Sequence, residues 1–199
     1  MSKDLIVSLR QSTGAGIVEI QKALVEANGD KNKAVEILRR RGAAKAIKRQ
    51  ERETREGVVH AYVHTNGRVG AMVEVACETD FVARNEDFKS FVHEVAMQVA
   101  AANPLYLKIE DVPKEVKEKE LQLYREELER AGKLKGKSEE MINKILEGKL
   151  AKYYADACLL EQVSIKDDSL TIREMVEQIT AKTGEKIEIR RFVRFAIGE

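Results

Sequence analysis

Residues 58–76 read VVHAYVHTNGRVGAMVEVA, and this stretch predicts a β-hairpin. Two apolar, β-branched runs, 58–63 and 69–76, have the composition of strands. The Asn-Gly pair at 66–67 favours a type I′ turn, because both central residues of that turn need positive φ angles. Both faces of such a hairpin are apolar, so we expect helices to cover one face and further protein, such as a second subunit, to cover the other.

The hairpin runs into residues 77–85, CETDFVARN, and then into an amphipathic helix. This helix has an apolar stripe that is expected to pack on the sheet, formed by Phe88, Phe91, Val92, Val95 and Val99. Phe81 therefore lies in a short connection between a strand and a helix. Its ring either folds back into the core or projects as an apolar knob, and the pattern alone favours the core.

The N-terminal residues 1–42 predict three short helices in a compact bundle. Breaks fall at residues 13–16 and at Asn28-Gly29, because glycine ends helices readily. Asp30 is placed to cap the third helix, and Gly42 is expected to end it. We predict a helical domain over residues 1–52 and a second domain over 53–199.

Residues 39–55 are rich in basic side chains, which are Arg39, Arg40, Arg41, Lys45, Lys48, Arg49, Arg52 and Arg55. One interpretation is a contact with phosphate or RNA. The other, which we favour, is a solvated linker helix between the two domains. No aromatic residue lies among the charges, so base stacking is not indicated.

The second half of the chain predicts a charged helical arm near residues 114–160 and a final strand over 187–197. Ser138 is placed to cap the second helix of the arm. The strand carries Ile187, Ile189, Val193 and Phe195 on one side, with Arg191 interrupting the pattern. The predicted fold class is α+β: a helical bundle followed by an antiparallel sheet packed with helices.

The composition argues against several classes of function. The 199 residues carry a net charge of only +1, so no strong overall field attracts nucleic acid. The two cysteines are far apart, two of the three histidines, His60 and His64, share a strand face without a nearby candidate nucleophile, and no phosphate-binding loop or metal-ligand spacing occurs. We therefore expect no catalytic residue, no metal and no cofactor. The absence of a signal-peptide pattern or a long apolar run predicts a cytoplasmic protein that does not bind membranes.

Several motifs carry a family resemblance. LRQSTGAGIVEIQKALVEANGDKNKAVEILRRRGAAKA at residues 9–46 resembles a ubiquitin-associated-like domain, and ETDFVARNEDF at 78–88 resembles a signature of the elongation factor Ts family. EGKLAKYYADACLLEQ at 147–162 and RRFVRFAIGE at 190–199 resemble its closing segments. The resemblance covers essentially the whole chain with several motifs in order. It implies a guanine-nucleotide exchange factor without an active site, whose partner is the GTPase elongation factor Tu in its GDP-bound and nucleotide-free forms.

The resemblance also implies which residues bind the partner. The segment Thr79, Asp80, Phe81 and Val82 is expected to insert beside the Mg²⁺ site of elongation factor Tu, so the resemblance favours an exposed Phe81. A second contact is implied at the bundle, through Arg10, Ile17 and Val18. Here aliphatic residues replace the methionines common in the family, and core packing of Ile17 and Val18 is the alternative.

Longer family members carry a duplicated hairpin-and-helix unit, whereas this chain has room for one copy. We therefore expect two chains to pair through their sheets and form a homodimer, giving a 2:2 complex with elongation factor Tu. Three other functions stay open: an RNA-binding module using residues 39–55, an enzyme, and a ubiquitin-associated-type scaffold that tethers partners without speeding nucleotide release.

Overall fold

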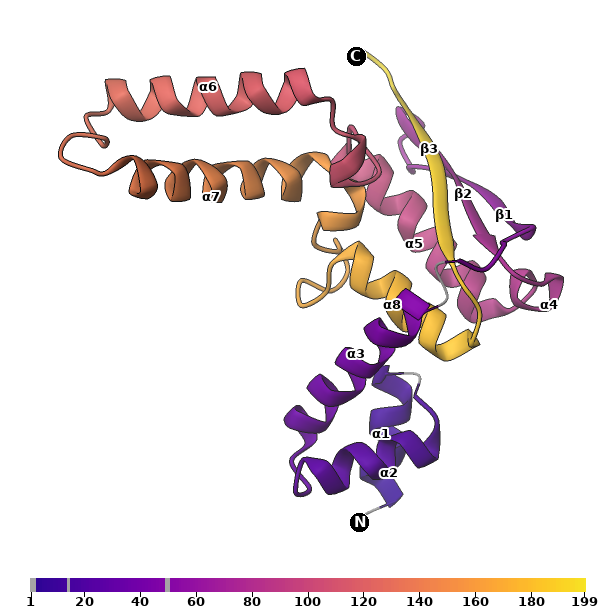
Figure 1. Cartoon of the computed structure of the whole chain (residues 1–199). Coiled ribbons are helices and arrows are strands. Elements are labelled where there is room, and N and C mark those ends of the chain that lie inside the picture. Colours follow the sequence, from indigo (N-terminus) through magenta and orange to yellow (C-terminus); the bar gives the residue numbers. More distant parts are fainter. Residues whose placement is uncertain (1–2, 14, 49–50) are drawn as a thin grey trace. The chain divides into compact units, whose positions relative to one another are not determined.

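The computed structural model describes residues 3–13, 15–48 and 51–199, with the backbone alone described at residues 11, 43 and 45–48. The chain forms two compact units. One comprises residues 1–100 and 173–199, and the other comprises residues 101–172. Figure 1 shows both units, and each is described by itself below. The predicted domain boundary at residue 52 stays a prediction.

The N-terminal helices form the predicted bundle. Its helices are α1 (Lys3–Thr13), α2 (Ile17–Glu26) and α3 (Lys31–Lys48). The bundle core consists of buried aliphatic side chains, chiefly Leu9, Ile20, Ala23, Leu24, Ala34 and Leu38. Asp30 begins α3 as predicted, because its Oδ1 accepts hydrogen bonds from the backbone N–H groups of Asn32 (2.9 Å) and Lys33 (3.1 Å).

The third helix is longer than predicted. We expected Gly42 to end it, but α3 continues to Lys48. Gly42 is not among the glycines with positive φ, so it does not adopt the left-handed conformation that terminates a helix. A glycine inside a helix costs only about 1 kcal/mol relative to alanine, and the helix-forming residues around it outweigh that cost.

The described residues build an antiparallel sheet in the order β1-β2-β3. Its strands are β1 (Glu56–Val63), β2 (Val69–Cys77) and β3 (Glu188–Ala196). The hairpin register is the one that the Asn-Gly turn favours, with Tyr62 opposite Ala71 and Val63 opposite Gly70. Helix α5 (Glu86–Ala102) runs along one face of this sheet (Figure 1), and its predicted apolar stripe is buried. The sheet with its covering helix confirms the α+β class.

A bulge in β3 changes which of its side chains face the core, and the sequence pattern did not predict this change. Ile189 pairs with Val75 whereas Arg191 pairs with Glu74, so Arg190 is an extra residue opposite a continuous β2. This bulge reverses the alternation of side chains. Ile187 and Ile189 are buried, but Val193 and Phe195 are exposed. We expected all four on one side, and Arg191, which interrupted the pattern, lies at the bulge.

Two further helices complete this unit, the short α4 (Asp80–Ala83) and α8 (Ile172–Thr183), whose first residue belongs to the other unit. We expected residues 79–83 to form only a connection, but they form one turn of helix with Thr79 in the N-cap position. Helix α8 ends at Thr183, and the next residue, Gly184, has a φ of 80° that lets the chain reverse into β3.

Residues 101–172 contain the predicted helical arm. Its elements are η1 (Ile109–Asp111), α6 (Lys114–Arg130), α7 (Glu139–Ala157) and η2 (Leu159–Glu161). The two long helices lie side by side (Figure 1), joined by a small core of Leu128, Ile142 and Leu146. Ser138 caps α7 as predicted, because its Oγ accepts a hydrogen bond from the Met141 N–H.

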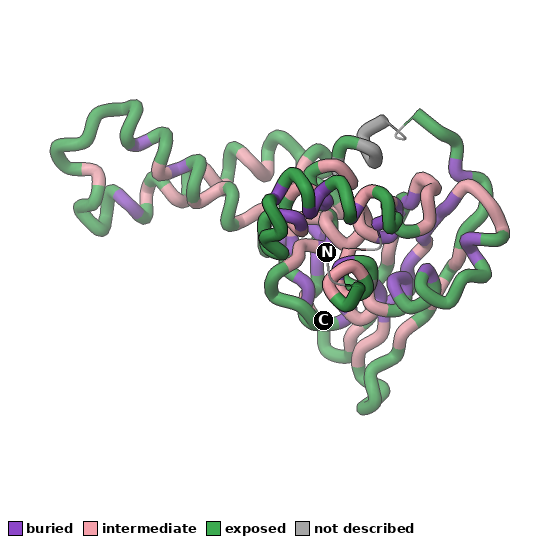
Figure 2. The backbone as a smooth tube through the Cα atoms, turned by 90° about the horizontal axis from the view of Figure 1, so that it is seen from below, coloured by how far each residue is buried: buried purple, intermediate pink, exposed green. Residues whose placement is uncertain are grey.

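Most of the α6–α7 arm is exposed, as Figure 2 shows, which fits its dense charge. Within the described ranges of the chain, no helix combines the length and apolar character that crossing a membrane requires.

Candidate partner-binding site

The end of β2 presents an exposed phenylalanine on a rigid support. Strand β2 ends at Cys77, and α4 follows after two residues. Val82 and Ala83 are each only 9% exposed, so they fix α4 to the sheet, whereas the Phe81 side chain is 81% exposed. One turn of helix therefore holds two apolar residues inward and one outward. Of the two alternatives for Phe81, the structure has the exposed one.

The polar residues in and beside α4 contribute little to the stability of this turn. Asp80 forms an ion pair with Arg84 across the turn, with 2.8 Å between Oδ2 and Nη2. Because both side chains are largely exposed, this pair contributes little to stability. Thr79 occupies the N-cap position, but its side chain makes no capping hydrogen bond to α4. Its hydroxyl is used elsewhere.

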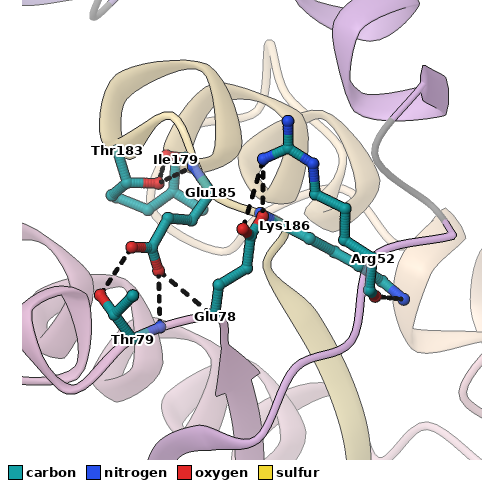
Figure 3. Close-up of polar contacts among 7 residues, drawn as sticks. All are labelled: Arg52, Glu78, Thr79, Ile179, Thr183, Glu185 and Lys186. Carbon is teal, nitrogen blue, oxygen red and sulfur yellow. Dashed lines mark hydrogen bonds and ion pairs between the residues drawn. The ribbon is translucent and has the colours of Figure 1, made fainter.

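The segment before α4 is bound by the turn that follows α8 (Figure 3). Oε2 of Glu185 accepts hydrogen bonds from the backbone N–H groups of Glu78 (3.1 Å) and Thr79 (3.0 Å). Oε1 of Glu185 accepts a third from the Thr79 hydroxyl at 2.6 Å. One carboxylate thus binds three donors at the entrance to α4, and such charge-assisted bonds are stronger than neutral ones.

A second carboxylate, that of Glu78, binds the turn after α8 from the β2 side (Figure 3). Oε1 of Glu78 accepts a hydrogen bond from the Lys186 N–H at 2.6 Å and pairs with Arg52 Nη1 at 3.2 Å. Glu78 and Glu185 therefore cross-link the two segments. Sequence reasoning missed both residues, because more than 100 residues separate the bonded groups and no local pattern marks the contact.

Cys77, the last residue of β2, contacts the same segment from the protein interior. It is fully buried, and its Sγ donates a hydrogen bond to the Thr79 carbonyl at 3.2 Å. Burial, and secondarily the charge of Glu185, raises the pKa of the Cys77 thiol to about 11. A thiol in that state is a poor nucleophile and a poor metal ligand.

The predicted secondary contacts lie on the bundle. Arg10 is exposed in the last turn of α1. Ile17 and Val18, in the first turn of α2, are 46% and 63% exposed, so core packing does not account for them. These three residues flank the turn between two helices of the bundle, whereas Thr79–Val82 follow the end of β2.

The basic stretch is partly neutralised by neighbouring acids. Arg41 pairs with Glu26 at 2.5 Å and Arg55 pairs with Glu53 at 2.6 Å, in addition to the Arg52–Glu78 pair. The side chains of Lys45 and Lys48, and Arg49 altogether, lie outside the described residues. The ion pairs that are described fit the linker interpretation better than a free phosphate-binding surface.

The sheet face that α5 leaves uncovered is apolar. We call it the outer sheet face, and it consists of exposed side chains from all three strands: Val59, Ala61, Val63, Met72, Val193 and Phe195. Gly70 lies opposite Phe195 and leaves a hollow between that ring and Val63. Contiguous exposed apolar surface of this kind marks an interaction site.

The three histidines lie near one another around β1. His60 Nε2 is 2.9 Å from His93 Nδ1, and the Tyr62 hydroxyl is 3.0 Å from His64 Nδ1. Burial, and secondarily the charge of His93, lowers the pKa of His60. Among the residues that the structure describes, no group of three or more His, Cys, Asp or Glu side chains is placed to hold a metal ion.

Comparison with known proteins identifies the family. The family model described as "Elongation factor TS" matches residues 31–199. The elongation factor Ts of Thermotoga maritima is 52% identical over 199 residues, which cover all of this chain and 97% of that protein. Those of Thermosipho melanesiensis and Moorella thermoacetica are each 50% identical, over 100% and 98% of this chain and 100% and 94% of those proteins. The chain therefore belongs to the elongation factor Ts family of translation elongation factors.

Proposed function

We propose that this protein is the guanine-nucleotide exchange factor of elongation factor Tu, and that Phe81 is its principal exchange residue. It binds the GDP complex of that GTPase, disturbs the Mg²⁺ and phosphate site, and stabilises the nucleotide-free form until GTP rebinds. The observation that carries this proposal is the 81% exposure of Phe81 on a helical turn whose neighbouring residues are buried. An aromatic ring that is fixed in place and left in solvent suits insertion into another protein.

Exchange of this kind needs no active site. Bound GDP is held through its phosphates and through the metal ion that bridges them. A factor that binds the empty GTPase more tightly than the loaded one must lower nucleotide affinity, because the coupling between the two sites is reciprocal. Returning nucleotide then expels the factor, which completes a catalytic cycle without bond chemistry.

The energy available from one ring is sufficient for a large effect. Burying a phenylalanine removes about 150–250 Å² from water, which is worth a few kcal/mol at roughly 25 cal/mol per Å². A tenfold change in affinity requires only about 1.4 kcal/mol. Thr79, Asp80 and Val82 are proposed to complete this interface, and Arg10, Ile17 and Val18 are proposed to supply the second contact.

We also propose that two copies pair through the outer sheet face. The face is apolar across all three strands, and the exposed Arg191 and its partner Glu74 lie at one end of it. In an isologous dimer each copy presents the same surface, so apolar centres stack and the two opposite charges can exchange partners between copies. The second copy supplies the sheet cover that this single-core chain lacks, which gives a 2:2 complex with elongation factor Tu.

Stopped-flow release of fluorescent GDP from elongation factor Tu tests the exchange function. Wild-type protein is expected to accelerate release, and Phe81→Ala is expected to lose at least about tenfold of that acceleration. Leu123→Ala is the matched control, because Leu123 is also an exposed apolar residue but lies on α6. A folded Phe81→Ala protein with unchanged activity refutes the role of Phe81, and binding without faster release identifies a tether instead.

A further inference from the structure

Residues Thr79–Val82, the proposed exchange segment, begin at a point that the turn between α8 and β3 holds in place together with β2. The carboxylate of Glu185 binds both backbone N–H groups and the hydroxyl that precede α4 (Figure 3). These bonds fix the peptide plane between Glu78 and Thr79 and the rotamer of Thr79. They therefore set the direction in which the chain leaves β2, and with it the direction in which α4 points.

Helix α4 does not supply this order by itself. It has four residues, which is far below the roughly 12–15 residues at which an isolated helix becomes marginally stable. Its N-cap residue, Thr79, donates its hydroxyl to Glu185 and makes no side-chain bond to the helix. The orientation of this turn therefore depends on tertiary contacts: the packing of the buried Val82 and Ala83, and the hydrogen bonds of Glu185 to the residues before α4.

Glu185 is itself held by the end of α8. The Thr183 hydroxyl donates to the Ile179 carbonyl at 2.8 Å, and the Glu185 N–H donates to the Thr183 hydroxyl oxygen at 3.4 Å. An ion pair of 2.7 Å between Lys182 and Asp87 joins the same end of α8 to the start of α5. The backbone of Glu185 is thus held at the end of α8, and α8 is joined to the start of α5, the helix that follows α4.

We propose that Glu185 is a positioning residue for nucleotide exchange, which acts by holding Thr79 so that Phe81 projects at the angle needed to enter the partner. This inference rests on the proposed function of Phe81. Glu185 needs no contact with the partner or the nucleotide, and its effect passes entirely through the orientation of α4. Loss of Glu185 should therefore matter only while the Phe81 ring is present.

A double-mutant cycle tests this dependence. Glu185→Ala, Glu185→Asp and Glu185→Gln are made in the wild-type and the Phe81→Ala backgrounds, and GDP release is followed against the concentration of the factor. We expect Glu185→Ala to lower the maximal release rate about tenfold, as expected for the loss of charge-assisted hydrogen bonds. The half-saturating concentration should change less, because the bundle contact is intact.

The three substitutions are expected to differ. Glu185→Gln is the conservative replacement and should keep most of the rate, because an amide oxygen can accept both backbone N–H groups. Glu185→Asp keeps the charge but is one methylene shorter, so it should lose rate as Glu185→Ala does. If Glu185→Ala fails to fold, Glu185→Asp provides the same cycle. Glu53→Ala is the control, because it removes an exposed carboxylate that pairs with the nearby Arg55 at 2.6 Å.

Hydrogen exchange gives a readout without the partner. The amides of Glu78 and Thr79 should exchange faster in Glu185→Ala, while the amides of α1–α3 stay unchanged. The double-mutant cycle has its own expected result. In the Phe81→Ala background, Glu185→Ala should leave the rate of GDP release unchanged.

Three results would overturn the inference. If folded Glu185→Ala and Glu185→Asp release GDP at the wild-type rate while Phe81→Ala does not, Glu185 has no positioning role and the proposed function stands. If the losses from the two sites multiply, Glu185 acts on something other than Phe81. If Phe81→Ala itself keeps the wild-type rate, the proposed role of Phe81 fails and the inference fails with it.

Discussion

The exposure of Phe81 is determined by the residues that follow it in the chain. A phenylalanine between a strand and a helix is usually a core residue, and the pattern alone favoured that position. In the structure, Val82 and Ala83 take the inward positions of a helical turn, which leaves the Phe81 ring in solvent. The sequence does not mark residues 80–83 as helical because a single turn has no hydrophobic period, so only the family resemblance favoured exposure.

The two cysteines should be almost unreactive in the folded protein. Both are fully buried, and burial raises the pKa of each thiol to about 11 from an ordinary value of 9.0. The thiolate fraction at pH 8 is then lower by roughly a hundredfold, and access is blocked as well. Titration with a chromogenic disulfide should detect no thiol in native protein and two in denaturant. Rapid reaction of Cys77 in the native state would contradict the arrangement beneath Thr79.

His60 should make the folded state less stable in mild acid. Burial and the neighbouring His93 lower its pKa below the ordinary value of 6.5, so the folded state binds this proton less readily than the unfolded state. The contribution is therefore complete above about pH 6.5 and is lost as the pH falls through the folded pKa. Urea unfolding between pH 5 and 7.5 should give a steeper fall for wild type than for His60→Gln. Equal slopes would show that protonation of His60 does not cause the loss of stability in acid.

At the scale of elements, the hairpin was the most predictable part and the strand after the bulge the least. Composition and the Asn-Gly turn determine β1, β2 and their register, because these signals are local. The side chains of β3 were assigned to one side because the pattern assumes regular alternation, and the extra residue at Arg190 reverses it. Gly42 was expected to end α3, but glycine terminates a helix only when its φ becomes positive.

Substitution of glycines in the arm should have opposite effects at two positions. Gly148 lies exposed inside α7 with no atom near the place of a side chain, so Gly148→Ala should stabilise the arm by about 1 kcal/mol. Gly132 has a φ of 67°, so Gly132→Ala should destabilise it by about 1 kcal/mol. Hydrogen exchange of the α7 amides measures both changes. Stabilisation by Gly132→Ala would mean that the turn after α6 does not use a left-handed residue.

At the scale of the whole molecule, two features support the proposed dimer and the proposed positioning of Phe81, and only the first could be predicted from the sequence. The apolar outer sheet face follows from the two-faced hairpin, because register fixes which residues share a face. The cross-links made by Glu78 and Glu185 could not be predicted, since they join residues brought together only by the complete sheet and α8. Contacts of this separation leave no trace in composition or periodicity.

The outer sheet face should determine the oligomeric state. Wild-type protein at micromolar concentration should scatter light with about twice the 22.5 kDa mass of one chain. Phe195→Asp places a charge on this face and should give a monomer. Phe81→Asp is the matched control, because both rings are highly exposed, at 73% and 81%, but only Phe195 belongs to the outer sheet face. A wild-type protein that scatters only as a single chain refutes the dimer.

Because α4 has only four residues, we do not expect residues 77–85 to keep their structure outside this protein. A synthetic peptide of residues 77–85 has neither the sheet that anchors Val82 nor the carboxylate that binds Thr79, so it should be an unstructured and weak competitor. Grafting those nine residues onto a loop of another scaffold should likewise fail unless the graft brings the α8–β3 turn with it. An inhibitor that imitates this surface would therefore have to reproduce the rigidity of the ring's support, not only its chemistry.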